Sequence, residues 1–407
     1  MPTATARAAF ESPDFRKFQV ARFALTVAIQ VQSAVVGWQV YALTDRPIDL
    51  GWVGLAQFLP VAGLSIVAGQ VADRYERVHV LLGSVAVMVG CTLLLAGFAA
   101  AGTGTLPIYA VIVLFGAARA FAGPASSALL TDLVPTAHLA NAVAWNSTTW
   151  QVATIAGPAF GGALFAGFGG AVGPYLVSAA LGVFSLVTLA SLQTRSGAME
   201  KRAATWEVAV EGLRYVRSNP LLLGAMSLDL FAVLLGGATA LLPVFARDIL
   251  HAGPIGFGVL RSSPAIGAAS MAALLAVRPI GRRTGRLLFG AVIVYGLATL
   301  VFALSSSIAL SVAALAVAGG ADMISVVIRQ TLVQVHTPSA MRGRVSAVHQ
   351  VFVGASNELG EFESGFTAQW FGAVRAVLLG GLGTLVVVAA WTRLFPELRH
   401  TDELSKP

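Results

Sequence analysis

Charged residues are scarce in this chain. They account for 11% of its 407 residues, whereas hydrophobic residues account for 57% and the mean hydropathy is +0.79. A soluble globular protein carries about 25% charged residues. This deficit is incompatible with a surface that faces water on all sides. The composition therefore excludes a soluble domain and predicts an integral membrane protein.

The residue patterns of catalytic and cofactor sites are also missing. The one cysteine, Cys91, lies within an apolar run, so no intramolecular disulfide can form. The six histidines show no metal-ligand spacing, and no Gly-x-x-x-x-Gly-Lys-Ser/Thr loop is present. We find no nucleophile–base pairing either. We therefore expect no metal, no cofactor, no catalytic residue and no ATP-driven pump, and we do not expect an enzyme.

Long apolar segments are what the chain has in abundance. A membrane-spanning helix needs about 20 mostly apolar residues. Twelve segments meet this requirement, at residues 18–43, 50–72, 78–101, 107–134, 139–167, 173–193, 220–247, 255–277, 286–306, 308–335, 345–370 and 374–395. We predict an all-α fold of twelve transmembrane helices, with a six-helix half over 1–193, a cytoplasmic linker over 194–219 and a second six-helix half over 220–407. The centre of the linker is amphipathic and suited to a membrane surface.

The basic residues give the orientation of these segments. On the side that holds both termini lie 19 of the 26 Lys and Arg residues, against four on the opposite side and three within segments. Lys and Arg accumulate in cytoplasmic loops, so we expect both termini to be cytoplasmic in a multi-pass protein of a bacterial-type inner membrane. The pI near 10.1 could suggest nucleic acid. The distribution of the charge argues against that partner.

The two halves repeat each other. Pro135 and Pro338 stand at the entrances of the fifth and eleventh segments, 203 residues apart. The same displacement places Gly157 on Gly360 and Gly162 on Gly365. Parallel repeats of this kind are typical of transporters built from two pseudo-symmetric halves.

Four ionisable residues within segments are candidates for function, because a charge inside a bilayer is costly and usually faces a cavity or a partner. The displacement of 203 pairs Arg119 with Asp322, and a shift of 207 pairs Arg22 with Asp229. We infer a cationic wall from one half and an anionic wall from the other. Arg22 could equally snorkel to the surface, and Arg329, near a segment end, is expected to do so.

The eleventh segment carries three carboxylates, Glu358, Glu361 and Glu363, within six residues. At about 100° per residue, Glu358 and Glu361 share a helix face, whereas Glu363 points nearly opposite Glu361. Either the nearby glycines unwind the helix or at least one Glu pairs with an Arg elsewhere. We expect a proton-coupling or substrate role for at least one of the three.

The remaining candidates lie in the first and fifth segments. Gln30, Trp145 and Asn146 could line a pocket that binds substrate. Gly157 and Pro158, followed by Gly161 and Gly162, combine a close-packing surface with a kink.

The loop from Gly69 to Arg77 carries Gly69, Asp73, Arg74 and Arg77 in the spacing Gly-x-x-x-Asp-Arg-x-x-Arg. It resembles the loop 2–3 signature of the major facilitator superfamily, in which the glycine permits close helix packing. Arg119-Ala-Phe-Ala-Gly123 resembles the fourth-segment pattern Arg-x-x-Gln-Gly, with Ala122 in place of the Gln. Gly157-Pro158 with Gly161-Gly162 resembles the fifth-segment signature of antiporter-type exporters. These resemblances imply a monomeric secondary transporter with the major facilitator fold.

Within the superfamily, three stretches resemble the enterobactin-exporter branch: Ala21–Phe23, Ala72–Arg77, and Gln330–Pro338 followed by Gly343-Arg344. The resemblance implies export of a siderophore or similar small amphiphile, coupled to protons, by alternating access. Arg22 and Arg119 would then meet anionic or catecholate groups, and the carboxylates would take the proton. Two alternatives stay open. One is a multidrug–proton antiporter for lipophilic cations, and the other is a sensor or partner subunit that transports nothing.

Overall fold

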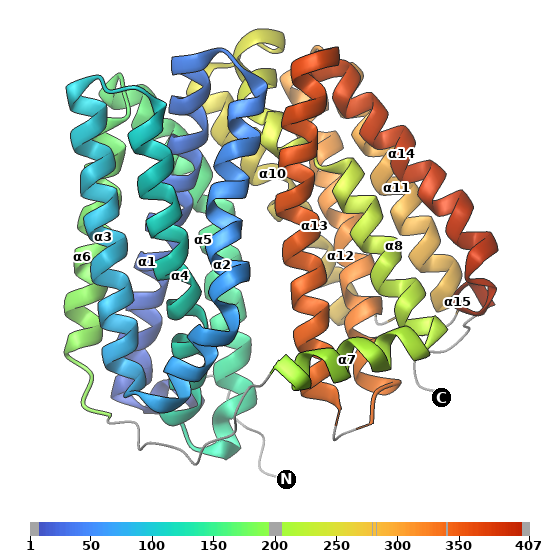
Figure 1. Ribbon diagram of the computed structural model, residues 1–407, viewed down its shortest axis with the longest axis horizontal. Coiled ribbons are helices and arrows are strands. Elements are labelled where there is room, and N and C mark those ends of the chain that lie inside the picture. Colours follow the sequence, from blue (N-terminus) through green and yellow to red (C-terminus); the bar gives the residue numbers. More distant parts are fainter. Residues whose placement is uncertain (1–7, 195–205, 279, 282, 339–340, 401–407) are drawn as a thin grey trace. The chain divides into compact units, whose positions relative to one another are not determined.

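The computed structural model describes residues 8–194, 206–278, 280–281, 283–338 and 341–400. These residues are almost entirely helical (Figure 1). The helices are η1 (Ala8–Glu11), α1 (Pro13–Thr44), α2 (Pro47–Arg74), α3 (Arg77–Ala101), α4 (Thr105–Asp132), η2 (Thr136–His138), α5 (Leu139–Phe168), α6 (Val172–Ala190), α7 (Trp206–Ser218), α8 (Pro220–Gly236), η3 (Ala238–Leu241), α9 (Leu242–Val244), η4 (Phe245–Ile249), α10 (Gly253–Val277), α11 (Thr284–Leu304), α12 (Ile308–Val335), α13 (Arg342–Phe371), α14 (Ala373–Leu394) and α15 (Pro396–His400).

The predicted all-α membrane fold is confirmed, and each predicted segment coincides with a helix or helical series to within a few residues. In the described part of the chain, 11 helices are long and apolar enough to cross a membrane. The eleventh predicted segment is not among these 11; it forms α13, which is 30 residues long but less apolar because it carries the three glutamates.

The chain divides into two compact units, residues 1–43 with 56–204, and residues 44–55 with 205–407. The division falls within α2, so the first turns of α2 belong to the second unit. Residues 206–218 of the predicted linker form α7 and also belong to the second unit. Figure 1 shows α7 crossing the ends of the helices against which it packs, α13 and α8.

In the first unit, small and polar side chains join α1 to its neighbours. A side chain at Gly157 of α5 would overlap Gln30, and one at Gly161 would lie 3.3 Å from the backbone of Val31. On other faces of α1, Tyr175 of α6 donates a hydrogen bond of 2.7 Å to Gln39. Thr92 of α3 donates one of 2.5 Å to Gln32. Because hydrocarbon offers no competing partners, such bonds help to fix the helices in one register.

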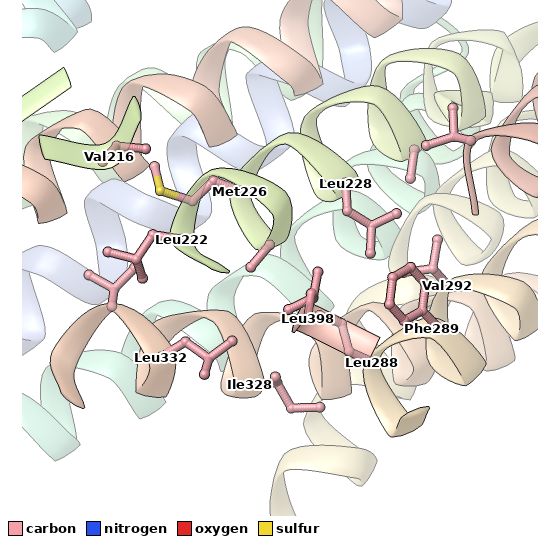
Figure 2. Packing of buried hydrophobic residues seen from close by; sticks show 14 of the residues in the cluster. Val216, Leu222, Met226, Leu228, Leu288, Phe289, Val292, Ile328, Leu332 and Leu398 are labelled. Atoms are coloured by element: carbon pink, nitrogen blue, oxygen red, sulfur yellow. The ribbon is translucent and has the colours of Figure 1, made fainter. Parts of the chain in front are cut away.

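The second unit has a hydrophobic core to which α7, α8, α11, α12, α13, α14 and α15 all contribute (Figure 2). Val216 of α7, Leu222 of α8, Ile328 of α12 and Leu398 of α15 are fully buried there. The amphipathic α7 therefore anchors its apolar face in protein, which explains why it packs as part of this unit.

The predicted continuous segment 220–247 is interrupted. Helix α8 ends at Gly236, and the chain continues through a 3₁₀ turn, a short α-helical turn and a π-helical turn to Ile249. Gly237 and Pro243, neither of which favours an uninterrupted helix, flank the change. Tyr295 of α11 donates a hydrogen bond of 3.1 Å to the Gly236 carbonyl, and Thr384 of α14 donates one of 3.0 Å to the Ala232 carbonyl. Tyr295 thus satisfies a carbonyl of the last turn of α8, which has no partner within the helix, and Thr384 adds a second acceptor bond one turn earlier.

Helices α10 and α12 approach most closely through glycine. A Cβ at Gly319 would overlap the backbone of Pro264, and one at Gly267 would overlap the Ala316 carbonyl. At the adjacent Gly320, a Cβ would lie 3.4 Å from the Gly267 carbonyl oxygen, an ordinary contact. Only a residue without a side chain fits at Gly267 and Gly319.

We expect Gly319→Ala to destabilise the protein by about 1–3 kcal/mol, because the added methyl forces α10 and α12 apart. Gly320→Ala, one residue away, is the matched control and is expected to change stability little. Thermal unfolding of the detergent-purified variants measures the difference. Equal melting temperatures for the two variants would contradict the packing described here.

Candidate functional site

Arg22 lies within α1 and reaches toward α4. Its guanidinium donates a hydrogen bond to the hydroxyl of the buried Ser126, and its Nε is buried without a hydrogen-bond partner. Among the described residues Arg22 makes no ion pair. Its guanidinium is thus held against α4 within the first unit, and the alternative of an arginine that snorkels to the surface stays a prediction. A charge held only by a hydroxyl retains unused hydrogen-bonding capacity for an anionic group.

The other polar candidates of the first unit lie on α1 and α5. Gln30 donates a hydrogen bond of 3.0 Å to Thr154 and lies over Gly157. The side-chain oxygen of Asn146 is buried without a hydrogen-bond partner among the described residues. Trp145 packs edge-to-face on Phe10 of η1, with 5.0 Å between the ring centroids, and so anchors the N-terminal turn.

Arg119 lies on α4 and is exposed on the first unit. It makes no ion pair or hydrogen bond with the described residues. On the same helix face toward the end of α4, Gly123 and Ser127 are exposed as well, whereas Ile112 and Gly116 on that face near the start of α4 are buried. The face of α4 that carries Arg119 is thus open over one half of its length only.

In the second unit, Asp229 of α8 forms a buried ion pair with Arg329 of α12. Arg329 is only 2% exposed, and its Nε also donates a hydrogen bond of 3.3 Å to the Ser325 carbonyl. The expectation that Arg329 snorkels to the surface is therefore wrong. Its side chain turns inward, where α8 supplies a buried carboxylate that would otherwise have no counter-ion.

Asp322 and two further polar side chains surround this pair. Asp322 lies two turns before Arg329 on the same face of α12 and interacts electrostatically with both Arg329 and Asp229. It makes no ion pair or hydrogen bond within the described residues. Tyr295 of α11 and His349 of α13 complete the cluster, with the buried Nδ1 of His349 left without a hydrogen-bond partner. The cluster thus holds two carboxylates and one guanidinium, so one carboxylate has no cationic partner among the described residues.

The three glutamates of α13 separate as the helical geometry predicts. A Cβ at Gly54, in the first turns of α2, would lie 2.8 Å from a carboxylate oxygen of Glu361 and 3.6 Å from one of Glu358. These two carboxylates therefore share a face, as predicted. Glu363 points elsewhere and accepts a hydrogen bond of 2.7 Å from Thr367. Helix α13 is continuous, so the alternative in which the glycines unwind it is wrong.

The loop motif splits into a buried and an exposed part. Arg77, at the start of α3, is buried and donates hydrogen bonds of 2.7 and 2.6 Å to Asp132, at the end of α4, and one of 3.2 Å to the Ala128 carbonyl. Asp73 and Arg74 are exposed. A Cβ at Gly69 would meet no atom within 4 Å, so the close packing implied for this glycine is absent within the described residues.

Gly157 and Gly360, the pair that the repeat predicts, occupy equivalent places in the two units. Gly157 of α5 faces α1, and Gly360 of α13 faces α8, where a Cβ would lie 2.9 Å from the Leu234 carbonyl oxygen. Pro158 is buried inside α5, which continues through it to Phe168.

Two charged residues form ion pairs in the structure although the sequence patterns do not single them out as functional. Asp132 is the partner of Arg77, and a carboxylate in the last turn of a helix next to a basic loop is a usable signal for such a pair. The place of Arg329 near a segment end predicts a side chain at the membrane interface. Its spacing of seven residues from Asp322, however, places both residues on one helix face. In the described residues, no group of three or more His, Cys, Asp or Glu side chains could hold a metal ion.

Comparison with known proteins agrees with this architecture. A bacterial homologue of the human lysosomal transporter Spinster, in an inward-facing and unoccupied conformation, superimposes with a TM-score of 0.75 at 16% identity, covering 96% of this chain and 99% of that one. The nucleoside transporter NupG gives a TM-score of 0.69 at 14% identity, covering 94% of this chain and 99% of that one. At such identities the likeness establishes the fold alone.

Sequence relatives are transporters. The enterobactin exporter EntS of Citrobacter koseri is 28% identical over 383 residues, which cover 93% of this chain and 87% of that protein. The MFS-type transporter YfiS of Bacillus subtilis is 28% identical over 371 residues, covering 86% and 85%. The profile of the family described as transmembrane secretion effector matches residues 4–406. Because this profile spans nearly the whole chain, the protein is a transporter rather than an enzyme, and it belongs to the transmembrane secretion effector family of the major facilitator superfamily.

Proposed function

We propose that this chain exports a siderophore or a similar small amphiphile with anionic or catecholate groups, in exchange for protons, by alternating access. The observation that carries the proposal is the state of Arg22, a cation within a membrane helix that is bound by one hydroxyl and by no carboxylate of the described residues. A half-buried arginine of this kind within a membrane helix is costly unless an anion binds it during the working cycle. The relatives named as enterobactin exporters support the same class of substrate.

The rest of the proposal follows from the first unit and from the charge distribution. Arg119 offers a second guanidinium on the open face of α4, and Gln30 and Asn146 add polar groups for orientation. We place the protein in a bacterial-type inner membrane as a monomer, with both termini in the cytoplasm, because the basic loops gather on that side. The halves 1–193 and 220–407 would move as the two bodies of the cycle.

The acidic cluster of the second unit suits the coupling proton. Asp229 already holds the guanidinium of Arg329, so its carboxylate is the permanent counter-ion. Asp322 has no such partner among the described residues, so its carboxylate is the one in this cluster that is free to take a proton. We therefore assign proton uptake to Asp322, with Glu358, Glu361 or Glu363 of α13 as further carriers. Protonation neutralises the cluster and alters its energy in the two conformations, which is the requirement for coupling.

A multidrug antiporter for lipophilic cations is the second candidate. The surplus of carboxylates in the second unit favours it, because Asp322 or the pair Glu358 and Glu361 could bind a cationic drug directly. The two functions differ in which unit supplies affinity. In the antiporter, Asp322→Asn abolishes efflux of a probe such as ethidium and Arg119→Gln spares it. A sensor or partner subunit would give no flux of either probe in proteoliposomes.

We expect Arg22→Gln to reduce export of enterobactin about tenfold or more, since a charge-assisted hydrogen bond is lost. Arg22→Lys should retain part of the activity. Export is measured by mass spectrometry of medium and cell pellet in an iron-starved host that lacks its own exporter. Arg46→Gln, at an exposed arginine near Asp49, is the control and should export normally. Unchanged export by Arg22→Gln, at equal protein level, would remove the assignment of Arg22.

We expect Asp322→Asn to abolish substrate-driven proton movement while the protein stays folded. A pH-sensitive dye inside proteoliposomes reports the proton movement, and the melting temperature reports folding. Proton movement that persists in Asp322→Asn would exclude Asp322 as the carrier.

Asp229→Asn, in contrast, is expected to cost about 3–5 kcal/mol of stability, because it leaves Arg329 buried without its counter-ion. The double variant Asp229→Asn with Arg329→Gln removes both charges and should recover much of that loss. Thermal unfolding of the two variants beside the parent protein tests this. Additive losses would show that the ion pair is not the interaction that holds α8 to α12.

A further inference from the structure

One end of the second unit carries a set of exposed arginines that no carboxylate of the described residues neutralises. This is the end at which α7 crosses α13 and α8, and at which α11 and α13 begin (Figure 1). Each of these arginines is exposed and makes no ion pair with the described residues: Arg214 and Arg217 of α7, Arg283 and Arg286 at the start of α11, Arg342 at the start of α13, and Arg399 of α15. We call this set the basic rim.

The opposite end of the same unit differs. Arg247 lies 2.7 Å from Asp45 and 3.6 Å from Asp248, and Arg46 lies 3.6 Å from Asp49. Arg46 and Arg247 are thus paired within the protein and Arg375 at that end has no ion pair with the described residues, whereas all six arginines of the basic rim are left for a partner outside it. The two ends differ in how many of their arginines form ion pairs as well as in how many arginines they carry. The general accumulation of basic residues on one side accounts for the number of arginines but not for their lack of ion pairs.

Helix α7 presents a surface suited to a bilayer. Its inner face is fixed: Val216 is fully buried, Tyr215 donates a hydrogen bond of 3.0 Å to the His336 carbonyl, and Glu211 pairs with Arg344 at 2.5 Å. On the flank next to this face, Leu213 is 47% exposed beside Arg217 and Arg214. A helix that offers apolar and basic side chains together on one flank is typical of segments that lie in the interface plane.

We propose that the basic rim binds the phosphate groups of anionic phospholipids, with α7 as its central element. Guanidinium groups pair with phosphate oxygens through two parallel hydrogen bonds, and an anionic leaflet attracts basic residues near its surface. The unneutralised arginines around one end of the unit match such a leaflet in charge. Leu213 reaches the acyl boundary while Arg214 and Arg217 meet the headgroups. The proposal does not depend on the transported substrate.

The test compares the full-length protein with Arg214→Gln/Arg217→Gln. Short-chain phosphatidylglycerol or phosphatidylcholine is added to the detergent-purified protein, and bound lipids are counted by native mass spectrometry. Phosphatidylglycerol should bind the parent more tightly than phosphatidylcholine, and less so as salt rises. In the double variant its affinity is expected to fall about tenfold to thirtyfold, from about fivefold for each lost arginine. Phosphatidylcholine binding should not change.

Arg375→Gln is the matched control, because Arg375 is equally exposed but lies at the start of α14, at the opposite end of the unit. It should bind phosphatidylglycerol as the parent does. A second variant, Arg283→Gln/Arg286→Gln, probes the rim away from α7 and should weaken binding similarly. Equal phosphatidylglycerol affinity in the parent and both double variants would overturn the proposal, as would an equal loss in Arg375→Gln.

Discussion

A charged side chain within the hydrocarbon of a membrane needs a partner there. This requirement determines where charged residues lie and what they contact in both units of the protein. In the second unit Arg329 finds Asp229, and the pair ties α12 to α8 in the middle of the hydrophobic core. In the first unit Arg22 finds only the hydroxyl of Ser126 among the described residues. The cost of burying an arginine is thus offset by a carboxylate of the protein in the second unit. In the first unit it is offset only in part, by a hydroxyl. The anionic amphiphile that we propose as substrate would use that opening, because a fully neutralised arginine has no hydrogen-bonding capacity left for it.

The acidic groups show the converse arrangement. Asp229 is occupied, so the cluster of Asp229, Asp322 and Arg329 carries one carboxylate more than it can neutralise. In the function proposed above, the coupling proton on Asp322 neutralises this surplus. Tyr295 belongs to this cluster and also donates to the Gly236 carbonyl at the end of α8. The interruption of α8 and the acidic cluster are therefore linked through one side chain, which gives a change in protonation a direct connection to the backbone of a membrane-spanning segment.

Backbone packing rests on a second consequence of the bilayer. Lipid tails are as apolar as leucine, so helices gain little from burying large apolar residues and approach instead through glycine. Gly267 and Gly319 bring α10 and α12 together, and Gly157 and Gly360 do so for equivalent helix pairs of the two units. Outside the hydrocarbon, ordinary ion pairs take over. Arg77 binds Asp132 across the ends of α3 and α4, and Arg46 and Arg247 bind neighbouring aspartates at the end of the second unit opposite the basic rim.

The sequence by itself determined the membrane class, the helical segments, the repeat and the shared face of Glu358 and Glu361. Each follows from local chemistry: apolar length, helical period and a regular spacing of glycines. Only the tertiary structure decided which charges meet. Asp229 pairs with Arg329, which is far away in the sequence. Because of this ion pair, Arg329 is buried in the core, although its place near a segment end predicts an interfacial side chain. The break after Gly236 and the packing of α7 also depended on neighbours, since Tyr295, Thr384 and the cluster around Val216 come from helices distant in the chain. Periodicity places a side chain on a face of its helix, but the helix that faces it is set by the packing of the whole unit.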